Sequence, residues 1–139
     1  MRAFELGDEL DTSENEELWL AGYYPIWALY FADPESARSA PLLKRFRGEM
    51  RYNLDMTCAW TQPPHHFDDM TILPTLTTVR CPALVIAGEH DFICGPSWNR
   101  PIAAAIPGAH YVEIADAGHM PQWEQPAAFK SALAAWMAT

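Results

Sequence analysis

The segment PALVIAGEHD, at residues 82–91, narrows the possible folds of this chain more than any other segment. Its apolar residues Ala83 to Ala87 run without interruption and end at Gly88. Such a run is typical of a strand buried on both faces of a parallel sheet, because a strand with one exposed face alternates apolar and polar side chains. The segment therefore predicts an α/β protein built on a parallel sheet.

The residues that follow continue the α/β order. A helical pattern covers residues 97–106, with Ser97 expected as its N-cap, and a β-rich stretch follows at residues 110–114. A last helix is expected to begin near Pro126, because proline suits the first helical position, and to run through Trp136. The order strand, helix, strand, helix predicts a parallel pair of strands.

The residues before this unit have a different pattern. Aromatic side chains recur at helical steps in one stretch (Trp19, Tyr23, Trp27, Tyr30, Phe31), and a second helical pattern runs over residues 36–56. The loop-like TQPPHHFDD then interrupts helical structure with two prolines. The chain is therefore expected to divide into residues 1–70 and residues 71–139.

Charge and composition argue against several classes of partner and location. The chain carries 18 acidic and 9 basic residues, a net charge of −9, which repels nucleic acid and anionic membrane surfaces. The longest uncharged stretch, residues 18–32, is too short to span a bilayer, and the first residues do not resemble a secretory signal. Three cysteines without a C-x-x-C pair indicate neither a disulfide framework nor a zinc ribbon, so we expect a reducing, cytoplasmic compartment.

Asp91 and His119 are the strongest candidates for catalytic residues. Each follows a predicted strand of the parallel pair, and open α/β sheets place their sites at the carboxyl ends of strands. A histidine can take the proton of a hydroxyl nucleophile, and a carboxylate on its other nitrogen fixes the tautomer and stabilises the imidazolium. These roles are predicted for His119 and Asp91.

The phrases PALVIAGEHD and HYVEIADAGHMP resemble the C-terminal end of the α/β-hydrolase superfamily. Over residues 66–139 the resemblance is nearest to proline iminopeptidase-like hydrolases. It implies a partial α/β-hydrolase fold, with residues 1–70 a helical cap and residues 71–139 the C-terminal part of the core. It also implies serine-type hydrolysis of an amide or ester, and prolyl aminopeptidase activity is one candidate. In prolyl aminopeptidases acidic cap residues hold the amino group of the substrate, and the candidates for that role here are Glu14, Glu16 and Glu17.

The chain departs from this family in lacking the nucleophile motif G-x-S-x-G. The nearest match begins at Gly95 and has no second glycine. Cys94 is an alternative nucleophile, and Asp116 is an alternative acid that we expect to shape a turn instead. A metal cluster at His65, His66, Asp68 and Asp69 is the other chemical alternative, but zincin spacing is absent. We expect no metal and no cofactor, since triad hydrolysis needs neither.

Two predicted strands do not complete a parallel sheet, because its edges and faces need cover. We therefore expect either an N-terminal hydrolase half in another region or chain, or self-association. The expected substrate is a small molecule or a short peptide. The alternative function is a non-catalytic hydrolase remnant that binds a small molecule or a protein partner.

Overall fold

The computed structural model describes residues 25–49 and 72–139. The elements in these ranges are, in order, α3 (Ser39–Glu49), α5 (Leu73–Leu76), β1 (Leu84–Gly88), α6 (Pro96–Ala105), β2 (His110–Ile114), α7 (Pro121–Glu124) and α8 (Pro126–Met137). The sequence from β1 to α8 confirms the predicted order of strand, helix, strand and helix.

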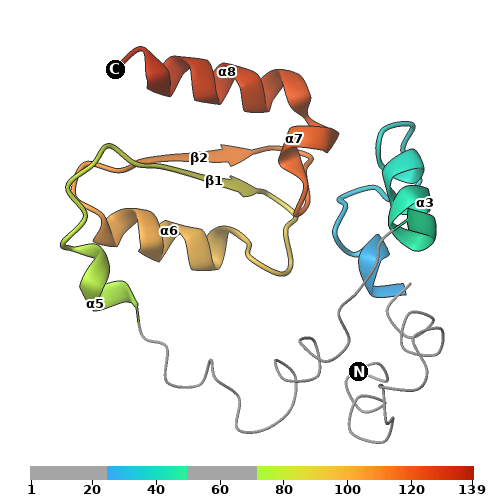
Figure 1. Ribbon diagram of the computed structural model, residues 1–139, viewed down its shortest axis with the longest axis horizontal. Helices are drawn as coiled ribbons and strands as arrows, with labels where there is room; N and C mark the ends of the chain where they lie inside the picture. Colours follow the sequence, from blue (N-terminus) through green and yellow to red (C-terminus); the bar gives the residue numbers. More distant parts are fainter. Residues whose placement is uncertain (1–24, 50–71) are drawn as a thin grey trace, which may run out of the picture. The chain divides into compact units, whose positions relative to one another are not determined.

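The strands β1 and β2 pair in parallel, as predicted, from Leu84 opposite His110 to Gly88 opposite Ile114. Helix α6 packs on β1 and β2 from one side, and α8 packs on β2 from the other, so that the sheet lies between two helical layers (Figure 1). This arrangement agrees with the predicted partial α/β-hydrolase fold, and it brings the carboxyl ends of β1 and β2 together at one edge of the sheet.

The burial of β1 differs from the expectation of a strand covered on both faces. Leu84, Val85 and Ile86 are only partly buried, whereas Ala87 and Gly88 are buried. The described sheet has two strands, so the first part of β1 has less cover than the interior strand of a wide sheet. Its carboxyl end is enclosed by the loops that follow both strands.

The start of α6 also differs from the prediction. Its N-cap is Gly95, Pro96 takes the first turn, and Ser97 lies inside the helix, so the assignment of Ser97 as N-cap is wrong. Proline is well placed there because the first helical N–H groups have no partner within the helix. Pro126 stands in the first turn of α8, as predicted.

Within the predicted helix over residues 36–56, α3 begins at Ser39 and is described to Glu49, and residues 50–56 lie outside the described ranges. The hydroxyl group of Ser36 accepts the N–H of Ser39 at 3.1 Å and satisfies one free donor at the start of α3. Of the aromatic stretch, Trp27 and Phe31 are buried, and Trp19 and Tyr23 lie outside the described residues.

The chain divides into two compact units, and one of them contains both strands. This unit combines Leu29–Pro41 with the described residues from 72 onward. Trp27 and Phe46 belong to the other unit, where their rings meet edge to face at 6.4 Å. The boundary between a cap at residues 1–70 and a core at residues 71–139 stays a prediction. No helix in the described ranges is long and apolar enough to cross a membrane.

Candidate active site

The loops that follow β1 and β2 are joined by backbone hydrogen bonds. Glu89 N–H donates to Ile114 O at 2.9 Å, and His90 N–H donates to Ala117 O at 2.8 Å. Gly88 makes this close contact possible, because a Cβ atom there would lie 2.6 Å from Ala117 O and closer still to Gly118 O. The two loops thus bring Asp91 and His119 to one place, although 28 residues separate them in sequence.

Asp91 and His119 form a hydrogen-bonded pair. Asp91 Oδ2 lies 2.9 Å from His119 Nδ1, and Oδ1 accepts the backbone N–H groups of Ile93 at 2.9 Å and Cys94 at 3.0 Å. The side chain of Asp91 is 7% exposed and that of His119 is 29% exposed. An ionised carboxylate only accepts hydrogen bonds, so the neutral imidazole carries its proton on Nδ1 and presents a lone pair at Nε2.

Tyr30 contacts His119 at both backbone and ring. Its carbonyl oxygen accepts the N–H of His119 at 2.7 Å, and the rings meet edge to face with centroids 5.0 Å apart. Burial, and then the nearby Cys94 and Asp91, raise the pKa of the Tyr30 hydroxyl above its ordinary value. Tyr30 therefore carries its proton beside the imidazole.

A pocket of about 270 Å³ opens at this pair. Its lining includes both Asp91 and His119, with Cys94 and Asn99 on the α6 side. The remaining lining residues are mostly apolar or small (Ile86, Gly88, Pro121, Gln122, Phe129). This mixture of an apolar wall and a few polar groups is typical of a small-molecule site.

The other acidic and imidazole groups near Asp91 have different surroundings. Asp116 is exposed with φ 52°, a left-handed conformation that suits a turn residue, and its carbonyl accepts the side-chain amide of Gln125 at 3.1 Å. Its expected turn role is thereby confirmed. Asp116, Glu89 and His90 place potential ligand atoms within 4.8 Å of one another, but all three are exposed.

Cys94 lies beside the pair, and its surroundings oppose a nucleophilic role. Burial, and then the charge of Asp91, raise the pKa of the Cys94 thiol. The thiolate is the nucleophilic form, and a raised pKa makes it scarcer at neutral pH.

Glu124 is a feature of the site that sequence reasoning missed. It is 6% exposed, and Oε2 accepts the N–H of Gly118, the residue before His119, at 2.7 Å. One signal was available, since Glu124 is the only acidic residue from Ala117 to Thr139. No comparable feature of the sequence indicates that Tyr30 contacts His119. The candidates Glu14, Glu16, Glu17, His65, His66, Asp68 and Asp69 lie outside the described residues.

The chain resembles known proteins over most of its length. The model of the alpha/beta hydrolase family matches residues 6–132. A Mycobacterium tuberculosis protein named "Putative non-heme bromoperoxidase BpoC" is 34% identical over 67 residues, which are 48% of this chain and 26% of that protein.

Solved structures share the fold. The enol-lactonase from Burkholderia xenovorans LB400 is 23% identical with a TM-score of 0.72, over 91% of this chain and 48% of that one. A hydrolase from Pseudomonas aeruginosa PA01 is 27% identical with a TM-score of 0.65, over 98% and 48%. The chain thus spans about half the length of these two structures.

Proposed function

The chain belongs to the α/β-hydrolase family, and on that premise we propose that it is the C-terminal part of a serine-type hydrolase. Asp91 and His119 are the acid and the base of its catalytic triad. The observation that carries the proposal is the 2.9 Å contact between His119 Nδ1 and Asp91 Oδ2. The position of each residue after a parallel strand supports the same assignment.

His119 moves the proton in the proposed reaction. Nε2 takes the proton of the nucleophile's hydroxyl group as its oxygen attacks the carbonyl carbon of the substrate. The imidazolium then gives this proton to the leaving alcohol or amine when the carbonyl–heteroatom bond breaks. In a second round water attacks the acyl carbon and loses a proton to Nε2, and the imidazolium returns this proton to the nucleophile's oxygen as the acyl–oxygen bond breaks, which releases the acid. Asp91 holds the Nδ1–H and stabilises each imidazolium through its charge.

The nucleophile of the proposed triad comes from outside this sequence. No G-x-S-x-G motif occurs in the chain, and the raised pKa of Cys94 disfavours a thiolate substitute. An N-terminal hydrolase half, in another region or another polypeptide, supplies both the serine and the backbone oxyanion hole. Self-association is the alternative way to cover the incomplete sheet, but a second copy of the chain brings no G-x-S-x-G motif.

The proposed substrate is a small molecule or a short peptide with an ester or amide bond. The pocket of about 270 Å³ beside His119 supports a small acyl group. The names of the similar proteins, which include a lactonase and esterases, favour esters and lactones. Removal of an N-terminal proline is the narrower form of the proposal, and it rests on the resemblance over residues 66–139.

A turnover assay tests the proposal. The chain is assayed alone, and again with the separately produced N-terminal portion of a family relative, on a p-nitrophenyl ester, a lactone and prolyl p-nitroanilide. Asp91→Asn should lower turnover by about 10⁴, because the amide disfavours the required tautomer, and His119→Ala should abolish it. Asp116→Asn is the matched control and should keep full turnover, because Asp116 is a turn residue with no proposed part in the reaction.

Each result separates the alternatives. Full turnover by Asp91→Asn contradicts the triad. Turnover by the chain alone, lost in His119→Ala, places a nucleophile within this chain or its oligomer. A chain that stays inert with every partner favours the non-catalytic remnant.

A further inference from the structure

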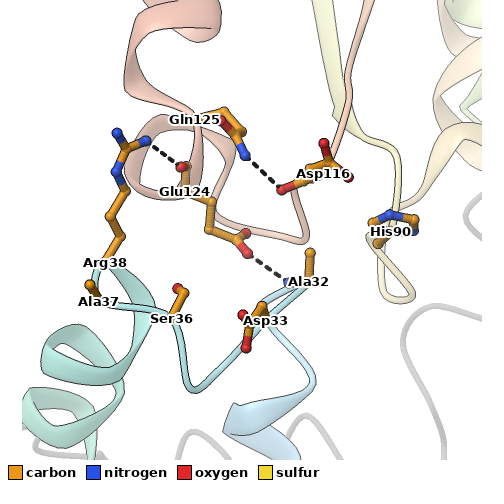
Figure 2. Close-up of a pocket in the computed structure, with 9 residues that line it drawn as sticks. All are labelled: Ala32, Asp33, Ser36, Ala37, Arg38, His90, Asp116, Glu124 and Gln125. Atoms are coloured by element: carbon orange, nitrogen blue, oxygen red, sulfur yellow. Dashed lines mark hydrogen bonds between the residues drawn. The ribbon is translucent and has the colours of Figure 1, made fainter.

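Glu124 is a buried carboxylate whose two oxygens bind different parts of the chain. Oε2 accepts the N–H of Gly118 at 2.7 Å, and Oε1 accepts the N–H of Ala32 at 2.6 Å. Figure 2 shows the side chain of Glu124 pointing from the end of α7 toward Ala32. The carboxylate therefore joins the loop of His119 to a segment 92 residues earlier in the sequence.

Residues 29–38, which we call the strap, make further contacts with the same loop. Tyr30 O accepts the N–H of His119 at 2.7 Å, and the ring of Tyr30 packs edge to face on the imidazole. At the other end of the strap, Arg38 Nη1 donates to the carbonyl oxygen of Glu124 at 2.8 Å (Figure 2). Glu124 thus receives hydrogen bonds from the strap through both its side chain and its backbone.

Gly118 leaves little space between the strap and the loop. A Cβ atom at Gly118 would lie 2.6 Å from Tyr30 O and 2.8 Å from Ala32 N. Backbone meets backbone here, so the orientation of His119 depends on where the strap lies. The strap in turn depends on Glu124, which accepts the Ala32 N–H in the middle of this contact.

We propose that Glu124 is a positioning residue for His119. By holding the strap against Gly118, it keeps the carbonyl oxygen and the ring of Tyr30 in place, and these fix the backbone and the plane of the imidazole. The inference rests on the proposed function, in which His119 is the base. Of the common side chains of this length, only a carboxylate accepts both N–H groups, because glutamine presents one oxygen and one NH₂ donor.

The test observes the imidazole of His119 directly. In the ¹⁵N-labelled chain, NMR measures the tautomer of His119 and the rate at which its Nδ1 proton exchanges with water. In Glu124→Gln we expect exchange to be about tenfold faster, the effect of losing one hydrogen bond to a charged group, and the Nδ1–H tautomer to lose its dominance. Glu35→Gln is the matched control, because it removes an exposed carboxylate from the same strap and should leave both signals unchanged.

A second measurement needs no variant. Because one carboxylate holds both groups, the backbone amides of Ala32 and Gly118 should exchange with water at matching protection in the wild-type chain. A folded Glu124→Gln with wild-type His119 signals overturns the positioning role. If that variant does not fold, an unprotected Ala32 amide beside a protected Gly118 amide in the wild type overturns it instead.

The outcome does not depend on turnover. Unchanged His119 signals in Glu124→Gln refute the positioning role and leave the proposed hydrolysis standing. A clear change in these signals, together with an inert assembled protein, refutes the hydrolysis and leaves the positioning role standing.

Discussion

At the scale of single residues, Gly118 is a position that leaves no space for a side chain. A methyl group at Gly118 would meet three backbone atoms of residues 30–32 within 2.8 Å. Backbone cannot move aside as the end of a flexible side chain can, so Gly118→Ala should lower the free energy of unfolding by about 1–3 kcal/mol. Urea denaturation measures the loss. An unchanged midpoint would show that the strap yields easily.

The thiol of Cys94 provides a prediction about pH. Burial and the charge of Asp91 raise its pKa, so its alkylation by iodoacetamide should accelerate only at a pH above the ordinary range for cysteine. In Asp91→Asn the repelling charge is gone, the thiolate forms more readily, and the rate profile should move to lower pH. Mass spectrometry of the Cys94 peptide measures the rate. A profile that stays in place would mean that Asp91 does not act on the thiol.

The site was only partly predictable at this scale. Asp91 and His119 were found because each follows a strand, and parallel strands end at the same edge of a sheet. Glu124 was missed because its partners are backbone N–H groups, which any residue supplies, and because Ala32 is 92 residues away. Hydrogen bonds of this kind have no pattern in the sequence.

At the scale of elements, the turn after α6 depends on backbone conformation. Gly108 has φ 73°, with open space around the position of a Cβ atom. Gly108→Ala should therefore destabilise the chain by about 1 kcal/mol through conformation alone. Gly48→Ala, within α3 and with equal space around it, should stabilise by about 0.5–1 kcal/mol. Thermal denaturation measures both, and effects of the same sign would contradict this explanation.

Elements with a strong pattern were predicted and short ones were not. The apolar run of β1, the β-rich residues of β2 and the Pro126 start of α8 each gave a local signal. Helices α5 and α7 have four residues each, too few to show a helical period. The sequence offered two start signals for α6, Pro96 and Ser97, and the prediction chose Ser97 as N-cap. Pro96 instead lies in the first turn, where its missing N–H costs no helical hydrogen bond.

At the scale of the whole molecule, exposed aromatic side chains predict association. Phe92, in the loop between β1 and α6, is 61% exposed, and Trp98, in the first turn of α6, is 68% exposed. We expect the isolated chain to self-associate with rising concentration, and the double variant Phe92→Ser, Trp98→Ser to weaken this. Sedimentation velocity measures it. Met137→Ser is the control: it removes an exposed apolar side chain near the end of α8 and should leave the self-association unchanged. A chain that is monomeric at every concentration contradicts the expectation.

The assignment of the strap to one unit was also beyond the sequence. The segment Leu29–Pro41, which contains the strap, lies in the stretch expected to be a helical cap, yet it clusters with β1, β2 and α8. Helical periodicity describes a segment by itself and does not say what that segment packs against.

The carboxylate that joins Ala32 to Gly118 has a consequence for biosynthesis. Ala32 leaves the ribosome 92 residues before Glu124 does. At about 5–20 residues per second, the emerging strap waits roughly 5–18 seconds for its partner. If Glu124 positions His119 as proposed, the imidazole receives its final orientation only after Glu124 has emerged, and a nascent chain that stops before α7 lacks the carboxylate that holds the strap against Gly118.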